Sequence, residues 1–107
     1  MPFSTAEERA IHFQKHGGGV GAATELAYEA MADAFMAGAM TLVMRECIRP
    51  NGTDRVRMNI ANRHLAVAIV VSGVLKTYYV VALHSINGHG HGSVTAYFNY
   101  ECTRTDL

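Results

Sequence analysis

Residues 55–71, RVRMNIANRHLAVAIVV, decide the fold class, because they contain two apolar patterns with the period of a β-strand. In 55–60, apolar and polar side chains alternate, so that one face of a strand is buried and the other is polar. Residues 61–63 make a short turn, and every second residue of 64–71 continues a buried face. The stretch therefore predicts two adjacent antiparallel strands.

Further strands are predicted on both sides of this pair. The sequence PNG at 50–52 closes an earlier strand, and Ser72-Gly73 marks a tight hairpin after the pair. The predicted strands cover 41–49, 55–60, 64–71, 74–83 and 94–102, with a loop over 85–92 before the last one.

The N-terminal third is predicted to be helical. Ser4 followed by Glu7 is a capping box, which starts a helix over 5–16 that a run of glycines then ends. Thr24 caps a second helix, 25–37, in which acidic residues recur at every fourth position. Two helices followed by an antiparallel meander are typical of an α+β fold. We therefore expect two N-terminal helices packed on an antiparallel sheet of four to five strands.

Length and composition are those of a single folded domain, residues 1–107. Half of the residues are hydrophobic and 17% are charged, which excludes a disordered chain. The net charge is zero, which argues against a strong nucleic-acid binder, although residues 45–76 carry six basic and two acidic side chains. This local excess suffices for a few phosphate contacts and not for tight non-specific binding at physiological salt.

The sequence has no feature typical of a membrane or exported protein. No apolar run is long enough to span a bilayer, and the first residues lack the charged-then-apolar pattern of a signal peptide. We therefore expect no membrane partner and a cytoplasmic location. Because nothing marks the chain as secreted, Cys47 and Cys102 are predicted to be buried free thiols rather than a disulfide.

The end of the first helix carries the first candidate site. His12, Lys15 and His16 lie at i, i+3 and i+4, so they share one helical face. Two imidazoles and an amine can move protons and bind anions, above all phosphate. The alternative is a solvated helix end, where cations are favoured by the helix dipole.

A polar face of the sheet is the second candidate. It comprises Arg55 and Arg57 and, two strands on, Lys76, Thr77 and Tyr79. Arginine binds phosphate through two parallel hydrogen bonds, and threonine and tyrosine supply hydroxyl donors. The alternative is the ordinary polar face of a half-covered sheet. Strict alternation also places Thr77 on the same face as Leu75 and Val81, toward the core.

The third candidate is a histidine loop. His84, His89 and His91 can chelate a transition metal such as zinc, copper or nickel. No acidic residue lies nearby to complete a ligand set, and the flanking glycines favour a mobile hairpin loop instead. We expect no cofactor and no metal, with the three histidines as the alternative metal site.

The order of these features resembles that of a family of bacterial polymorphic and phage-associated toxin domains. The similarity consists of HFQKHG at 12–17, a helix holding Tyr28 and Phe35, and the paired strand segments DRVRMNIANRHLAV at 54–67 and SGVLKTYY at 72–79. It covers roughly residues 7–80. Such domains resemble the ribonuclease superfamily that includes barnase, EndoU, certain colicins and RelE.

The resemblance implies a metal-independent endoribonuclease with RNA, either tRNA or mRNA, as substrate. Carried over by position, the catalytic residues are His12 or His16, with Lys15, Arg57 and Thr77. Arg55, Lys76 and Tyr79 of the polar sheet face are expected to bind the substrate. A neutral imidazole would take the 2′-hydroxyl proton, and Lys15 and Arg57 would stabilise the charged phosphorane. A cognate immunity protein and delivery into a target-cell cytoplasm are the partner and location that a toxin implies.

Two other functions stay open. The chain can be an inactive, phage-derived relative that acts as a small oligomeric binding or structural protein, for example a homodimer through helix 25–37. It can also be a metal- or ligand-binding module built on the histidine loop.

Overall fold

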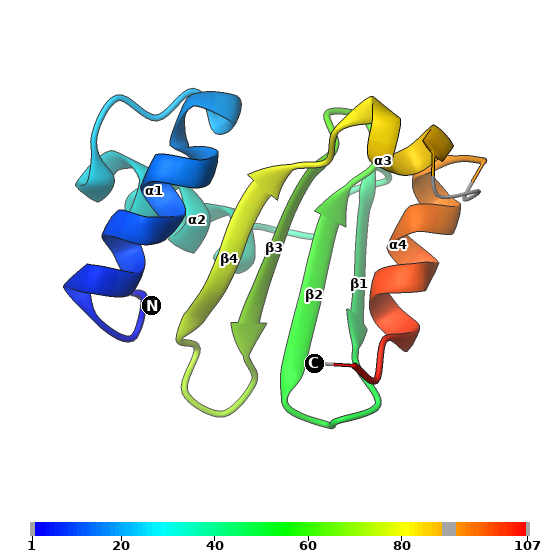
Figure 1. The fold of residues 1–107 in the computed structure, drawn as a ribbon. Coiled ribbons are helices and arrows are strands. Elements are labelled where there is room, and N and C mark those ends of the chain that lie inside the picture. Colours follow the sequence, from blue (N-terminus) through cyan, green and yellow to red (C-terminus); the bar gives the residue numbers. More distant parts are fainter. Residues whose placement is uncertain (1, 89–91, 107) are drawn as a thin grey trace.

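The computed structural model describes residues 2–88 and 92–106 and has an α+β fold (Figure 1). The elements are α1 (Ala6–Val20), α2 (Glu25–Ala37), β1 (Met44–Ile48), β2 (Asp54–Asn59), β3 (His64–Ile69), β4 (Leu75–Val80), α3 (Leu83–Gly88) and α4 (Val94–Thr103). The strands form one antiparallel sheet in the order β1-β2-β3-β4. The predicted α+β class, with two N-terminal helices packed on an antiparallel sheet, is confirmed.

The helices divide the sheet into two faces. α1 lies along β4, and α2 packs on β3 and β4; we call this side the α2 face (Figure 1). α4 packs on β1 and β2 from the opposite side, which we call the α4 face. Each face has its own apolar core, centred on Tyr28 and Tyr78 on the α2 face and on Met58 and Leu65 on the α4 face. The sheet is therefore buried on both sides, although α4 covers only its β1–β2 half.

The predicted strand 94–102 is wrong, because these residues form α4. Alternating apolar residues indicated a strand, yet the buried residues Tyr97, Phe98 and Glu101 recur with helical spacing. The helix begins after Ser93, whose side chain accepts a hydrogen bond from the Ala96 N–H at 3.1 Å. The preceding strand also ends earlier than predicted, at Val80, and α3 occupies the first half of the expected loop 85–92.

α1 departs from its predicted bounds at both ends. Thr5, rather than Ser4, caps the helix, and its side chain accepts a hydrogen bond from the Glu8 N–H at 3.0 Å. The helix continues through three glycines to Val20 and ends at Gly21, which has the left-handed φ of 84°. Tertiary packing overrides the weak helical preference of glycine here, because the buried Val20 anchors the last turn in the core.

An irregularity in β4 sets the orientation of its side chains. Val67 pairs with Thr77, but the next residue, Ala68, pairs with Leu75, so Lys76 is an extra residue of the bulge type. Leu75 therefore packs in the α2-face core, while Thr77 lies on the opposite face with Val67. The expectation from strict alternation, with Thr77 beside Leu75 in the core, is wrong for this reason.

Cys47 and Cys102 form a disulfide between β1 and α4, so the prediction of two free thiols is wrong. Because the two cysteines lie 55 residues apart, the crosslink removes much conformational freedom from the unfolded chain. Loop-closure entropy for this length corresponds to about 4 kcal/mol of stabilisation. The pairing depends on α4 lying against β1, which the sequence alone did not indicate.

The glycines of α1 give a direct test of this packing. A Cβ at Gly17 would lie 2.4 Å from the Phe13 ring, whereas one at Gly18 would have no neighbour within 4 Å. We expect Gly18→Ala to raise the free energy of unfolding by about 0.5–1 kcal/mol, because alanine favours the helix. Gly17→Ala should lower it, because Phe13 must leave its place in the core.

Urea unfolding followed by circular dichroism measures both effects. Gly19→Ala is the matched control, since a Cβ there is also unobstructed and should stabilise α1 in the same way. A helix that ended at residue 16, as the sequence predicted, would respond alike to all three substitutions.

Candidate functional site

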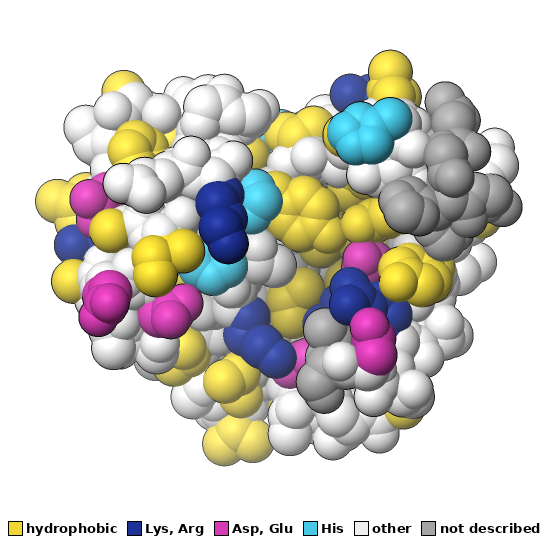
Figure 2. Space-filling view, in the orientation of Figure 1, with side chains coloured by type: hydrophobic (Ala, Val, Ile, Leu, Met, Phe, Trp, Pro, Cys, Tyr) yellow, Lys and Arg dark blue, Asp and Glu magenta, His cyan; other side chains and the backbone are white. Residues whose placement is uncertain are grey.

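A groove lies on the α4 face of the sheet, between α1 and α4. Figure 2 shows a hollow with an apolar floor, with Lys and His side chains on one wall and a mixture of basic and acidic side chains on the other. A pocket of about 230 Å³ occupies the part nearest α4. Its lining residues are Arg49, Val67, Lys76, Thr77, Tyr79, Glu101 and Arg104. The groove exists because α4 leaves the β3–β4 half of this face uncovered.

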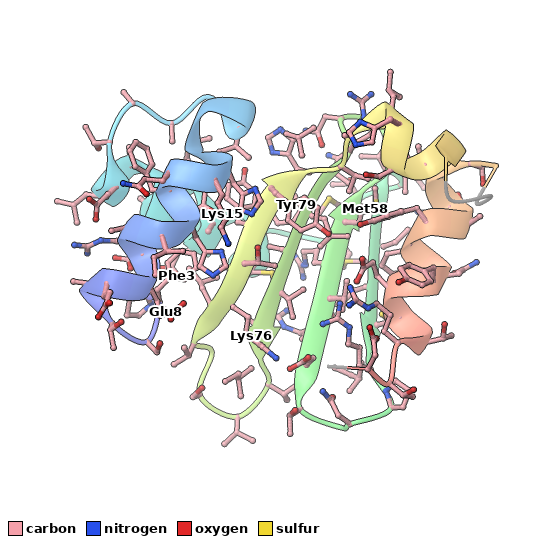
Figure 3. The ribbon with its side chains drawn as sticks, viewed as in Figure 1. Phe3, Glu8, Lys15, Met58, Lys76 and Tyr79 are labelled. Carbon is pink, nitrogen blue, oxygen red and sulfur yellow. A yellow bond between two sulfur atoms is a disulfide. The ribbon has the colours of Figure 1, made fainter. Side chains whose placement is uncertain are left out.

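The wall formed by α1 presents His16 and Lys15 toward β4. The His16 ring centroid lies 5.2 Å from that of Tyr79, and Lys15 is exposed on the side of α1 that faces Tyr79 (Figure 3). Burial, and then the charges of His12 and Lys15, lower the pKa of His16 below its usual 6.5. At neutral pH the imidazole of His16 is therefore uncharged and can accept a proton. Lys15, the preceding residue in the sequence, supplies an ammonium group on the same wall.

His12 is held more firmly than His16. Its ring stacks on Phe3 at 5.2 Å and lies 6.0 Å from the ring of His16. Its Nε2 is 3.7 Å from a Glu8 carboxylate oxygen, and its Nδ1 is buried with no hydrogen-bond partner among the described residues. Burial lowers the pKa of His12, against the opposing effect of Glu8. The geometry makes His12 a packing partner of the N-terminal segment that supports His16.

Tyr79 is fixed in place by α4. Its hydroxyl lies 3.0 Å from that of Tyr97, which donates its own proton to Glu101 at 2.9 Å. A phenol has one proton, so Tyr79 is the donor to Tyr97, and its oxygen keeps a free acceptor position. Burial raises the pKa of Tyr79, with a further contribution from the Glu101 charge, so the phenol stays protonated at neutral pH.

Beneath the pocket runs a chain of alternating charges. Lys76 Nζ lies 3.1 Å from both Asp54 oxygens, and Asp54 accepts a hydrogen bond from Arg49 at 3.1 Å. Arg49 continues to Glu101 at 2.6 Å, and Glu101 pairs with Arg104 at 3.2 Å. Figure 3 shows Lys76 reaching from β4 across the sheet toward β2. The chain of charges joins β4, at one edge of the sheet, to the end of α4.

The carboxylate of Asp54 is stabilised despite its burial. Burial alone would raise its pKa, but hydrogen bonds from Lys76, Asn51 and Arg49 outweigh this effect and hold the pKa below its usual value. Asp54 is therefore charged at neutral pH, and it keeps both cations oriented. Removing either cation would leave a buried negative charge with fewer partners.

Arg55 and Arg57 do not belong to the groove, because both lie on the α2 face. Arg57 donates hydrogen bonds to the carbonyls of Phe35 and Gly38, and Arg55 to that of Met36 at 3.2 Å. Both also pair with Glu46, at 2.8 and 2.9 Å. The two arginines satisfy the last carbonyl groups of α2, a structural function. Arg57 therefore does not lie beside Thr77, since the sheet separates the two side chains.

The histidine loop lies only partly within the described residues. His84 is exposed on α3, and His89 and His91 lie outside the described residues. Within 2–88 and 92–106, no group of three His, Cys, Asp or Glu side chains is placed to hold a metal ion. No helix in this part of the chain is long and apolar enough to cross a membrane.

Four residues of the groove were missed as site residues, namely Arg49, Tyr97, Glu101 and Arg104. Three of them lie on or next to α4, which the sequence pattern indicated as a strand. The spacing of Tyr97 and Glu101, four residues apart, was the available signal, because it brings the two side chains together only in a helix. Of the predicted residues, His16, Lys15, Lys76, Thr77 and Tyr79 border the groove.

No protein-family model matches the chain, and no significant match was found among curated proteins or solved structures.

The histidines predict how stability depends on pH. Burial is the main cause that lowers the pKa values of His12, His16 and His64 below the unfolded value of 6.5. The folded chain then binds fewer protons than the unfolded chain, so acid favours unfolding. We expect the free energy of unfolding to fall as the pH decreases from about 7.5 through 6.5 toward the folded pKa values.

Urea denaturation at pH 7.5, 6.5 and 5.5 measures this change. Asp54 does not contribute to the change in stability between pH 7.5 and 5.5, because it becomes protonated in the folded chain only below its unfolded pKa of 3.8. His64→Gln should flatten the slope, since the amide can still hydrogen-bond with the Tyr78 hydroxyl and does not titrate. A constant or rising stability on acidification would contradict the neutral, buried histidines.

Proposed function

We propose that the protein is a metal-independent endoribonuclease of the toxin type, with its active site in the groove between α1 and α4. The observation that carries this proposal is the contact of His16 with Tyr79, which brings the helix-end residues to the uncovered face of β4. A neutral imidazole and an exposed ammonium group then border one open groove, which Thr77 also lines.

In this mechanism His16 is the general base. It takes the proton of an RNA 2′-hydroxyl, whose oxygen then bonds to the adjacent phosphorus. The bond from phosphorus to the 5′-oxygen breaks, and that oxygen takes a proton from water in the open groove. Lys15 stabilises the additional negative charge on the phosphate. RNA is the substrate class because its 2′-hydroxyl is the internal nucleophile.

Tyr79 offers a surface on which a base can stack. It is part of the groove floor, and its ring orientation is fixed through Tyr97 and Glu101. Stacking of bases on aromatic side chains is common in recognition of single-stranded RNA and tolerates different sequences. Arg57 has no catalytic function in this mechanism, since its hydrogen bonds hold the end of α2.

The Cys47–Cys102 disulfide gives information on the cellular compartment in which the protein resides. Disulfides persist in oxidising compartments and are rare in the reducing cytosol. Cys47–Cys102 therefore supports a protein that passes through an oxidising environment, as a toxin delivered into another cell does, over one that stays in the cytoplasm. A cognate immunity protein would be expected to cover the groove.

A non-enzymatic RNA- or ligand-binding protein is the second candidate. It is favoured by the pairing of pocket cations with carboxylates, which leaves little net charge to stabilise a phosphorane. A homodimer through α2 is less favoured, because Tyr28, Ala32 and Met36 pack inside the chain and Leu26 is the one large apolar residue of α2 that is clearly exposed.

Incubation of the purified protein with tRNA in EDTA tests the enzyme. We expect cleavage products that end in a 2′,3′-cyclic phosphate, and we expect His16→Ala to reduce the rate at least 100-fold, the order of magnitude of a lost general base.

His84→Ala is the matched control, since it removes an exposed histidine from another helix, one that does not line the pocket. It should cleave at the rate of the unmodified protein, and circular dichroism should show that both variants are folded. Absence of cleavage at any protein concentration would leave the binding protein as the function.

A further inference from the structure

The pocket beside α4 differs from the His16 end of the groove in its accessible charge. Its formal charges nearly cancel, yet the two carboxylates within the chain are buried, Asp54 with 1% and Glu101 with 3% of the side chain exposed. The cations at the two ends are open, Lys76 with 43% and Arg104 with 25% exposed. A ligand in the pocket therefore meets positive charge that buried carboxylates hold in position.

The pocket also supplies an uncommitted donor and an apolar wall. The Thr77 hydroxyl has no hydrogen-bond partner within the described part of the chain, and Val67 and Tyr79 line the same space. Two cations, a hydroxyl donor and an adjoining aromatic ring suit a phosphate attached to a nucleoside.

The two cations of this pocket lie away from His16, because Lys76 is directed toward Asp54 of β2 and Arg104 follows the last turn of α4. Lys76 precedes Tyr79, which contacts His16, by three residues of β4. Because Lys76 is the extra residue of the bulge, this separation along the strand is less than that of three regular strand residues, which is about 10 Å. A phosphate on Lys76 is thus a neighbouring one of the same RNA.

Asp106 engages two of the hydrogen-bond donors of Arg104 in the free protein. Its carboxylate accepts hydrogen bonds from Arg104 Nε at 3.0 Å and from its terminal nitrogen at 3.1 Å, and its side chain is 65% exposed. A phosphate would make the same paired contacts. The Asp106 carboxylate thus occupies the position on Arg104 that a phosphate would take, and a phosphate can displace it.

We propose that Lys76, Arg104 and Thr77 form a second phosphate subsite, which binds a phosphate adjacent to the scissile one and competes there with Asp106. The substrate is accordingly an oligonucleotide rather than a dinucleoside monophosphate. This inference rests on the proposed function.

Binding of uncleavable ligands tests the subsite separately from catalysis. The probes are a 2′-deoxy dinucleoside monophosphate and the same compound with an additional 5′- or 3′-phosphate, titrated into the full chain and followed by calorimetry at low salt. We expect one terminal phosphate to increase affinity at least tenfold. Lys76→Met and Arg104→Gln should each remove most of that gain, and Asp106→Asn should increase it.

Arg45→Gln is the control, because it removes one positive charge from β1 outside the pocket and should keep the full gain. No gain in the unmodified protein, or a gain that persists in both Lys76→Met and Arg104→Gln, would overturn the subsite. So would equal displacement of the phosphorylated probe by a glutamate-rich peptide of the same charge, which would indicate an acidic protein partner. The tRNA assay reports on the enzyme independently, so either proposal can fail alone.

Discussion

The groove depends on the contacts of the Arg49 guanidinium group with two carboxylates. The guanidinium group lies between two buried carboxylates, donating to Asp54 at the start of β2 and to both the side chain and the backbone carbonyl of Glu101 in α4. A charge this deeply buried is stable only when its partners are complete, so β2 and α4 must both be in place. Through Glu101 the same contact extends to Tyr97 and Tyr79, and through Asp54 to Lys76. The disulfide adds a covalent tie between the same two layers.

The two faces of the sheet use arginine for different purposes, and this explains the outcome for the predicted site. On the α2 face, Arg55 and Arg57 satisfy carbonyl groups at the end of α2, which has no left-handed glycine to do so. On the α4 face, Arg49 organises a pocket that stays open because α4 covers only β1 and β2. The result is a groove whose α1 wall carries proton-accepting and cationic groups and whose α4 wall carries an oriented charge network.

The sequence predicted the fold class, the second helix and the four central strands, because these depend on strong periodicity and on local caps such as Thr24. It did not predict α4, since alternating apolar residues in 94–102 favoured a strand and only packing on β1 and β2 decides for a helix. The sheet face on which Thr77 lies could not be predicted, for another reason. One extra residue at Lys76 reverses the alternation of side chains, and no local sequence pattern marks it. His16, Lys15 and Tyr79 could be selected by residue type, whereas Arg49 and Glu101 become site residues only through contacts between distant segments.

Mapping of a bound, uncleavable RNA by nuclear magnetic resonance tests the central claim, that the groove on the α4 face is the functional surface. Titration of the labelled protein with a short 2′-O-methyl RNA should shift the amide signals of 12–16, 76–80 and 97–104, which line the groove from α1 to α4. The signals of 35–38, where Arg55 and Arg57 hold the end of α2, should stay unchanged. Shifts confined to that α2 end, or no saturable shifts at all, would contradict the account.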